Sequence, residues 1–178
     1  VLRGSAKGAV SLTFDDGPDP ESTTLILDVL QKTGDRATFF LLADQVEAHP
    51  ELARRIAAEQ EVGVHGLHHD LSVALSSPEK GAAVLMEAAE RIARVTGVQP
   101  VWYRPPFGIV TPRLMEAVDK VPLVTVWCSV RTRDGVGGTS QWLRQRCRTA
   151  VEGDIVLMHE GQRAARDALS VILEDLRE

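Results

Sequence analysis

The sequence is short of three features that would narrow its function, and each shortage excludes a class of protein. Two cysteines in 178 residues, Cys128 and Cys147, are too few for a disulfide framework, and we expect both to be free. Acidic residues outnumber basic ones by 25 to 20, with the two signs interspersed, which argues against a nucleic-acid partner. No apolar run approaches the ~20 residues that cross a bilayer, so no membrane span is expected.

Short apolar segments alternate with helical patterns along the whole chain, so residues 1–178 are expected to form one domain. The segments are rich in β-branched and aromatic residues, which is typical of strands buried on both faces. Capping residues and prolines frame the helical patterns between them. The expected strands are Ala9–Phe14, Ala37–Leu42, Val62–His65, Val101–Arg104, Leu123–Trp127 and Asp154–Met158, and the expected helices are 22–34, 50–60, 77–97, 111–120, 140–153 and 163–176.

This alternation predicts an α/β protein with parallel strands joined by right-handed crossovers. Two architectures fit the pattern: a (β/α) barrel and an open, doubly wound sheet. No glycine-rich phosphate loop follows the first strand, which disfavours the dinucleotide-binding form of the open sheet. A barrel is therefore favoured, and six units make it an incomplete one compared with eight.

Polar residues gather where the expected strands end. In a parallel barrel the carboxyl ends of all strands open on one rim, and chemistry takes place there. Residues spread over most of the chain are therefore expected to meet at one mouth. They are Asp15, Asp16, His65, His68, His69, Arg104, Asp134 and His159.

The spacing of His65 and His69 suits a metal site, because two residues four apart can present their rings on one side of a turn. Two imidazoles and one carboxylate form a three-ligand site with room for water. Zinc is the first choice, while Co²⁺, Ni²⁺ and Fe²⁺ also accept such ligands. Taken alone, an Asp-Asp pair is a common turn or helix cap and a His-x-x-x-His a common polar loop. Their joint placement on one rim is what favours a metal.

Five short motifs occur in a fixed order: TFDDGP at 13–18, HGLHH at 65–69, RPPFG at 104–108, RTRDG at 131–135 and LMH at 157–159. In these motifs the chain resembles the NodB-type polysaccharide deacetylases of carbohydrate esterase family four. The resemblance implies a distorted (β/α) barrel with seven or eight strands. It also implies metal-dependent removal of acetyl groups from N-acetylhexosamine residues of a polysaccharide or oligosaccharide, such as peptidoglycan or chitin.

The resemblance also implies roles for individual residues. Asp16, His65 and His69 resemble the family's metal triad. Asp15 resembles the catalytic base, and Arg104 resembles the residue that pairs with that base. Adjacent side chains diverge, so one acid of the pair can reach the metal while the other faces the attacking water. A positive Arg104 beside Asp15 would keep that carboxyl ionised.

The remaining roles fall near the end of the chain and on the third motif. His159 resembles the catalytic acid that protonates the departing amine, and Asp134 resembles the acid that tunes it. Phe107 matches the position whose backbone N–H helps hold the oxyanion. Leu157 matches a wall of the pocket for the acetyl methyl group. His68, between the two histidine ligands, has no counterpart role in the family.

The fourth motif departs from the family pattern, which usually reads Asp-x-x-Asp-Trp. Arg131 stands at the first acid and Gly135 at the tryptophan, which predicts a wider or more mobile cleft. Trp127 and Trp142 are candidates to replace the lost tryptophan in the groove. A buried core position is the favoured expectation for both.

Two other functions remain open on the sequence alone. An O-acetyl esterase acting on xylan or a similar glycan would use the same machinery, and a carbohydrate-binding relative without turnover would keep only the cleft. The expected partner in every case is an acetylated polysaccharide or oligosaccharide. The family resemblance implies an extracellular or cell-envelope location, and a monomer is slightly favoured.

Overall fold

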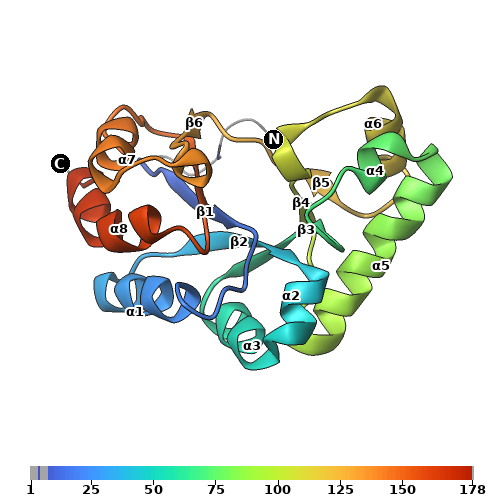
Figure 1. Cartoon of the computed structure of the whole chain (residues 1–178), viewed down its shortest axis with the longest axis horizontal. Coiled ribbons are helices and arrows are strands. Elements are labelled where there is room, and N and C mark those ends of the chain that lie inside the picture. Colours follow the sequence, from blue (N-terminus) through green and yellow to red (C-terminus); the bar gives the residue numbers. More distant parts are fainter. Residues whose placement is uncertain (1–3, 5–7, 178) are drawn as a thin grey trace.

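A single curled sheet of parallel strands forms the centre of the computed structural model, which describes residues 4 and 8–177. The strand order is β5-β4-β3-β2-β1-β7-β6, and the helices surround the sheet from outside (Figure 1). This half-barrel, in which β5 and β6 form the two ends, confirms the expected incomplete barrel. The strands are β1 (Ser11–Asp15), β2 (Ala37–Leu42), β3 (Glu61–Gly66), β4 (Trp102–Tyr103), β5 (Val124–Thr125), β6 (Val130–Arg131) and β7 (Ile155–His159).

The helices are α1 (Thr23–Thr33), α2 (Ala43–Ala48), α3 (Pro50–Glu59), α4 (Ser72–Leu75), α5 (Pro78–Thr96), α6 (Pro112–Val118), α7 (Ser140–Cys147) and α8 (Arg163–Asp175), with two 3₁₀ turns, η1 (Pro106–Gly108) and η2 (Asp134–Val136). Four of the helices in the described part of the chain, α3, α5, α6 and α7, begin at a capping side chain or at a proline, which lacks the N–H that would otherwise be left free. The Thr111 hydroxyl accepts from Leu114 N at 3.1 Å, and the Thr139 hydroxyl accepts from Trp142 N at 3.2 Å.

Several sequence-based boundaries were wrong. The structure has a strand that was not expected, β6, within the segment taken as a loop after the fifth strand. The expected strands near residues 101–104 and 123–127 shrink to two residues each, because only Trp102–Tyr103 and Val124–Thr125 pair with neighbours. The helix expected to reach Gly153 ends at Cys147.

The core lies between the sheet and the surrounding helices. Phe14 of β1 and Phe39 of β2 stack with their ring centroids 5.1 Å apart and are fully buried. Apolar side chains from α1, α3, α5 and α8 join the same cluster, including Leu30, Ile56 and Ile92. This packing fixes the strands, and thereby the residues at their carboxyl ends.

Both cysteines are buried and free, as expected. In the described part of the chain, no helix combines the length and the apolar character that a bilayer crossing requires.

Candidate active site

A cavity of about 390 Å³ opens at the carboxyl ends of the strands. β1 brings Asp15 and Asp16 to it, β3 brings His65, and β7 brings His159. Asp15 and His159 are register partners on the neighbouring parallel strands β1 and β7. The fold therefore places residues from opposite ends of the chain side by side.

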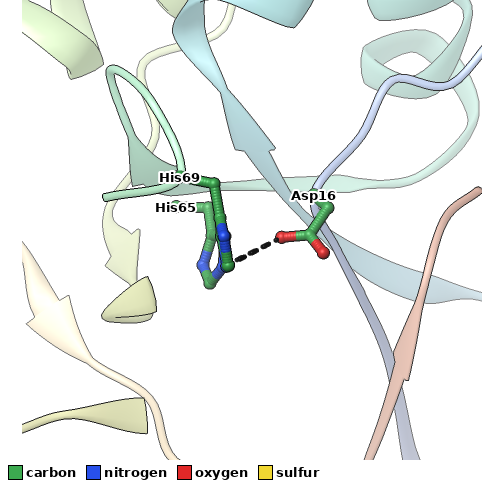
Figure 2. A group of neighbouring side chains, drawn as sticks. All are labelled: Asp16, His65 and His69. Carbon is green, nitrogen blue, oxygen red and sulfur yellow. Dashed lines mark ion pairs between the residues drawn. The ribbon is translucent and has the colours of Figure 1, made fainter. Parts of the chain in front are cut away.

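Asp16, His65 and His69 form the innermost group (Figure 2). The Asp16 carboxylate faces both imidazoles, with its Oδ1 3.2 Å from His65 Nε2 and 3.4 Å from His69 Nε2. The two rings stack with centroids 5.4 Å apart. One ligand atom from each residue lies within 4.8 Å of the others, close enough for the three residues to hold one cation between them.

The hydrogen bonding of His65 shows that these residues suit a cation. Its Nδ1 lies 2.8 Å from the carbonyl oxygen of Arg104, and a carbonyl only accepts, so Nδ1 carries the hydrogen. In the neutral ring Nε2 then has a lone pair that faces Asp16 Oδ1, which is buried and has no hydrogen-bond partner. Two lone pairs facing each other are satisfied by a positive ion. A backbone carbonyl that fixes the tautomer is the usual support of a histidine ligand.

The charges around Asp16 and His69 favour the protonation states that bind metals. Burial opposes the Asp16 carboxylate, but the neighbouring imidazoles of His65, His69 and His159 outweigh it, and the pKa of Asp16 is lowered. Burial is the largest influence on His69 and lowers its pKa, against the opposing charge of Asp16. A carboxylate and a neutral imidazole are therefore favoured near neutral pH.

Asp15 is a buried carboxylate paired with a buried guanidinium. Arg104 Nη1 donates to Asp15 Oδ1 at 2.8 Å and to the Thr13 hydroxyl at 2.7 Å. The Arg104 guanidinium also lies over the Phe40 ring, 4.2 Å from its centroid, and its Nη2 donates to the Trp127 carbonyl at 3.2 Å. The arginine is thus held from several sides, and it holds one oxygen of Asp15 in place.

His159, the register partner of Asp15 on the neighbouring strand, is bound to Asp134. Its Nδ1 lies 2.8 Å from Asp134 Oδ1, and the Thr132 hydroxyl oxygen lies 2.9 Å from the same carboxylate oxygen. Burial disfavours the imidazolium, but the hydrogen bond and charge of Asp134 outweigh burial and raise the pKa of His159. The loop of the degraded fourth motif therefore still brings its acid to the histidine.

Three non-glycine residues in the described part of the chain have a positive φ, and all three line this cavity: Asp16 at 78°, Phe107 at 58° and Arg133 at 60°. A positive φ costs free energy in any residue other than glycine, and such strained residues are concentrated at functional sites. The Phe107 ring lies 4.2 Å from that of His69, centroid to centroid, and more than half of Phe107 is exposed. Leu157 lines the cavity from β7.

The expectation of a buried core position was wrong for both tryptophans. Trp127 is half-buried and lines the cavity, because β5 ends two residues before it, and Trp142 is exposed on α7. His68 points elsewhere, with its Nδ1 3.0 Å from Asp44 Oδ2. Gly135 lines the cavity, and a Cβ there would lie 3.3 Å from the His159 ring.

Sequence reasoning missed Glu160, which contacts the Asp15–Gly17 segment through its backbone and its side chain. Its backbone N–H donates to the Asp15 carbonyl at 2.9 Å, and its buried side chain accepts from the Thr23 hydroxyl. A Cβ at Gly17 would lie 1.4 Å from Glu160 Oε2, so only glycine fits above the acid. Burial raises the pKa of Glu160 to about 8. The only local sequence signal that another segment packs closely here is the glycine that follows the two acids, in the run Asp15 to Gly17.

Known proteins are similar to this chain in sequence and in fold. A family model described as polysaccharide deacetylase matches residues 3–126. Peptidoglycan-N-acetylmuramic acid deacetylase PdaC of Bacillus subtilis is 32% identical over 169 residues, covering 94% of this chain and 35% of that protein. A peptidoglycan-N-acetylglucosamine deacetylase of Bacillus cereus is 33% identical over 178 residues, covering 96% of this chain and 64% of that protein.

A solved structure with a TM-score of 0.90 and 28% identity is a pseudoenzyme of carbohydrate esterase family 4 from Bacillus anthracis. The match covers 99% of this chain and 63% of that one. The chain spans about a third and about two thirds of the length of the two curated relatives named above. The family model covers well over half of the chain and includes the first three motifs, so the chain belongs to the polysaccharide deacetylase family.

Proposed function

We propose that the chain is a metal-dependent hydrolase that removes the acetyl group from N-acetylhexosamine residues of a polysaccharide or oligosaccharide. The observation that carries this proposal is the lone pair of His65 Nε2 facing Asp16 Oδ1, in the same cavity as the Asp15–Arg104 and His159–Asp134 pairs. The curated relatives, named as peptidoglycan deacetylases, support the substrate class.

Asp16, His65 and His69 would hold the metal, for which zinc is our proposal. A divalent cation at such a site polarises a carbonyl and lowers the pKa of a bound water from ~15.7 toward ~7. His65 is fixed for this task by its bond to the Arg104 carbonyl.

Asp15 is proposed as the base. Its Oδ1 is occupied by Arg104, while its Oδ2 faces the triad, 3.9 Å from His65 Nε2. A carboxylate oxygen so placed can take the proton of a water that attacks the acetyl carbonyl. The Asp15–Arg104 pair is almost fully buried, which keeps the base in one orientation.

His159 is proposed as the acid. Asp134 accepts the hydrogen of Nδ1, which leaves Nε2 as the atom that delivers a proton to the departing amine. Because the pKa of His159 is raised, the ring is protonated in a larger fraction of the protein molecules near neutral pH. Leu157 and the backbone of Phe107 would hold the acetyl group between the two catalytic residues.

The fold alone does not carry this proposal, because a pseudoenzyme shares it. The proposal rests on the side chains that the cavity retains. We propose a location at the cell envelope or outside the cell together with the activity, because the curated relatives are named for peptidoglycan.

Acetate release tests the proposal. Zinc-reconstituted protein is incubated with an N-acetylglucosamine tetramer and, separately, with acetylated xylan, and acetate is measured alongside the mass of each oligosaccharide. We expect loss of acetyl groups from the tetramer, at a higher rate than from xylan, and none with Asp15→Asn. Faster release from xylan would instead identify an O-acetyl esterase, and release from neither glycan, with sugar binding intact, would identify a binding protein.

A further inference from the structure

We propose that Arg131 and Arg133 form an anion subsite, so that the preferred substrate carries a carboxylate close to its N-acetyl group. The inference rests on the proposed deacetylase function and names a subclass of its substrates, the acidic N-acetylated glycans. Both arginines line the cavity that holds the metal triad.

The guanidinium groups of Arg131 and Arg133 are exposed and free to bind an anion. No carboxylate in the described part of the chain forms an ion pair with either of them. The third arginine of the cavity, Arg104, differs because it is buried and pairs with Asp15. Each guanidinium offers five N–H donors and no acceptor, and both residues are exposed and line the cavity.

Arg131 is held at the mouth by its neighbours. Its guanidinium carbon lies 5.3 Å from the centroid of the Trp127 ring, a contact that orients the planar group. Gly108 makes room for it, because a Cβ there would lie 3.1 Å from Arg131 Nη2 and 3.3 Å from the Trp127 ring. Arg131 pairs in register with Leu157, the proposed wall of the acetyl pocket, on the adjacent strand β7.

Arg133 is held by its backbone. Its φ of 60° is unusual for a residue with a side chain, and the turn that requires it is anchored by Thr132 and Asp134. The Thr132 hydroxyl donates to the Leu157 carbonyl at 2.7 Å, and Asp134 Oδ2 accepts from His159 N at 2.8 Å. The same turn thus places Arg133 at the cavity and Asp134 on the proposed catalytic acid.

A carboxylate is the ligand that this pair suits. The acids of the cavity, Asp15 and Asp16, already face Arg104 and the histidines, so they do not neutralise the two exposed arginines. Guanidinium groups bind planar carboxylates through paired N–H donors. In a glycan the carboxylate comes either from a lactyl ether on the N-acetylated sugar or from a uronic acid next to it.

The test compares matched oligosaccharides with zinc-loaded protein. The lactyl arm is the peptide-free peptidoglycan tetrasaccharide and its carboxyl-amidated form. The uronic arm is a tetrasaccharide of alternating N-acetylglucosamine and glucuronic acid, again with its amide. The neutral N-acetylglucosamine tetramer reports the proposed deacetylase activity by itself.

We expect kcat/KM for the acid to exceed that for its amide by roughly 10- to 100-fold in at least one arm. The arm that shows this ratio identifies the source of the carboxylate. In the double variant Arg131→Gln, Arg133→Gln the ratio should fall close to one. Arg94→Gln, which removes one positive charge from the exposed face of α5, should keep the wild-type ratio.

A wild-type ratio close to one in both arms would overturn the inference, as would a ratio that survives the double variant. If the double variant does not fold, salt decides: the acid's advantage should shrink as ionic strength rises, while an advantage that is unchanged by salt contradicts an ion pair. If no substrate releases acetate, the proposed function fails, and the dissociation constants of acid and amide then test the subsite directly. Tighter binding of the acid would support it, and equal binding would overturn it.

Discussion

Asp134 binds His159 through both of its carboxylate oxygens: Oδ1 lies 2.8 Å from the ring Nδ1, and Oδ2 accepts the backbone N–H at 2.8 Å. The carboxylate therefore fixes the main chain and the ring of the same residue. Because one oxygen orients the imidazole and also favours its charged form, the loss of Asp134 should change the pH dependence of the reaction as well as its rate.

Asp134→Asn should move the alkaline limb of the activity profile to lower pH. Asp134 raises the pKa of His159, while burial lowers it, so removal of the carboxylate leaves burial to dominate. The proposed acid must be protonated, and activity therefore declines as pH rises through this pKa. The measurement is kcat against pH with an N-acetylglucosamine oligomer. Asp44→Asn, which alters a carboxylate bonded to the uninvolved His68, should leave the profile unchanged.

Loss of either imidazole of the triad should remove the metal and the activity together. His65→Ala and His69→Ala each delete one of three ligand atoms that lie within 4.8 Å of one another. Elemental analysis after zinc reconstitution and dialysis should give about one zinc per wild-type chain and much less for either variant. His68→Ala lies in the same loop outside the triad and should keep its zinc. Equal zinc in all four proteins would contradict the assignment.

Asp15→Asn should abolish turnover while the metal remains bound. The amide keeps an oxygen that can accept from Arg104 but cannot take a proton from water, so kcat should fall by roughly 10²–10⁴. The neighbouring Asp16→Asn should instead lose metal as well as activity, because Asp16 belongs to the triad. Acetate release and zinc content, measured on both variants, separate the two roles. Near-normal turnover of Asp15→Asn would show that another group is the base.

Glu160 should make the protein less stable as pH rises. Its pKa is raised from 4.5 to about 8 by burial, so the folded state holds a proton that the unfolded chain releases. A raised folded pKa means that the stabilisation is complete below pH 4.5 and is lost as pH rises through about 8. The loss amounts to on the order of 5 kcal/mol over that range.

Urea unfolding at several pH values measures this effect. Glu160→Gln cannot ionise, so its free energy of unfolding should fall less than that of the wild type between those pH values. The exposed Glu152→Gln should follow the wild-type curve. Parallel curves for the wild type and Glu160→Gln would show that Glu160 does not hold its proton in the folded state.

The placement of the site could be predicted from sequence because it depends on strand ends. Asp15 and His159 each follow an apolar run, and parallel strands carry such residues to one mouth whatever the length of chain between them. The strand β6 could not be predicted in this way. Val130 and Arg131 are two residues without an alternating pattern, and they pair only because β7 offers a neighbouring edge.

The burial of individual side chains could not be predicted from the sequence for a related reason. Trp127 was expected in the core because an apolar run precedes it, but β5 ends at Thr125 and leaves the indole at the mouth. Glu160 has a carboxylate side chain, which is usually exposed, and nothing in the neighbouring sequence indicates that it is buried against Gly17. Both outcomes depend on where distant segments pack, which local patterns do not record.

The contact between Gly17 and Glu160 makes these two positions interdependent in any redesign of the protein. A side chain at residue 17 needs the space that the long acid at residue 160 fills. A library that randomises residue 17 alone should return mostly glycine at that position. Randomising residues 17 and 160 together can recover a bulkier residue at 17 beside a shorter one at 160. Diversity in this loop is therefore accessible only through simultaneous change at two places 143 residues apart in the chain.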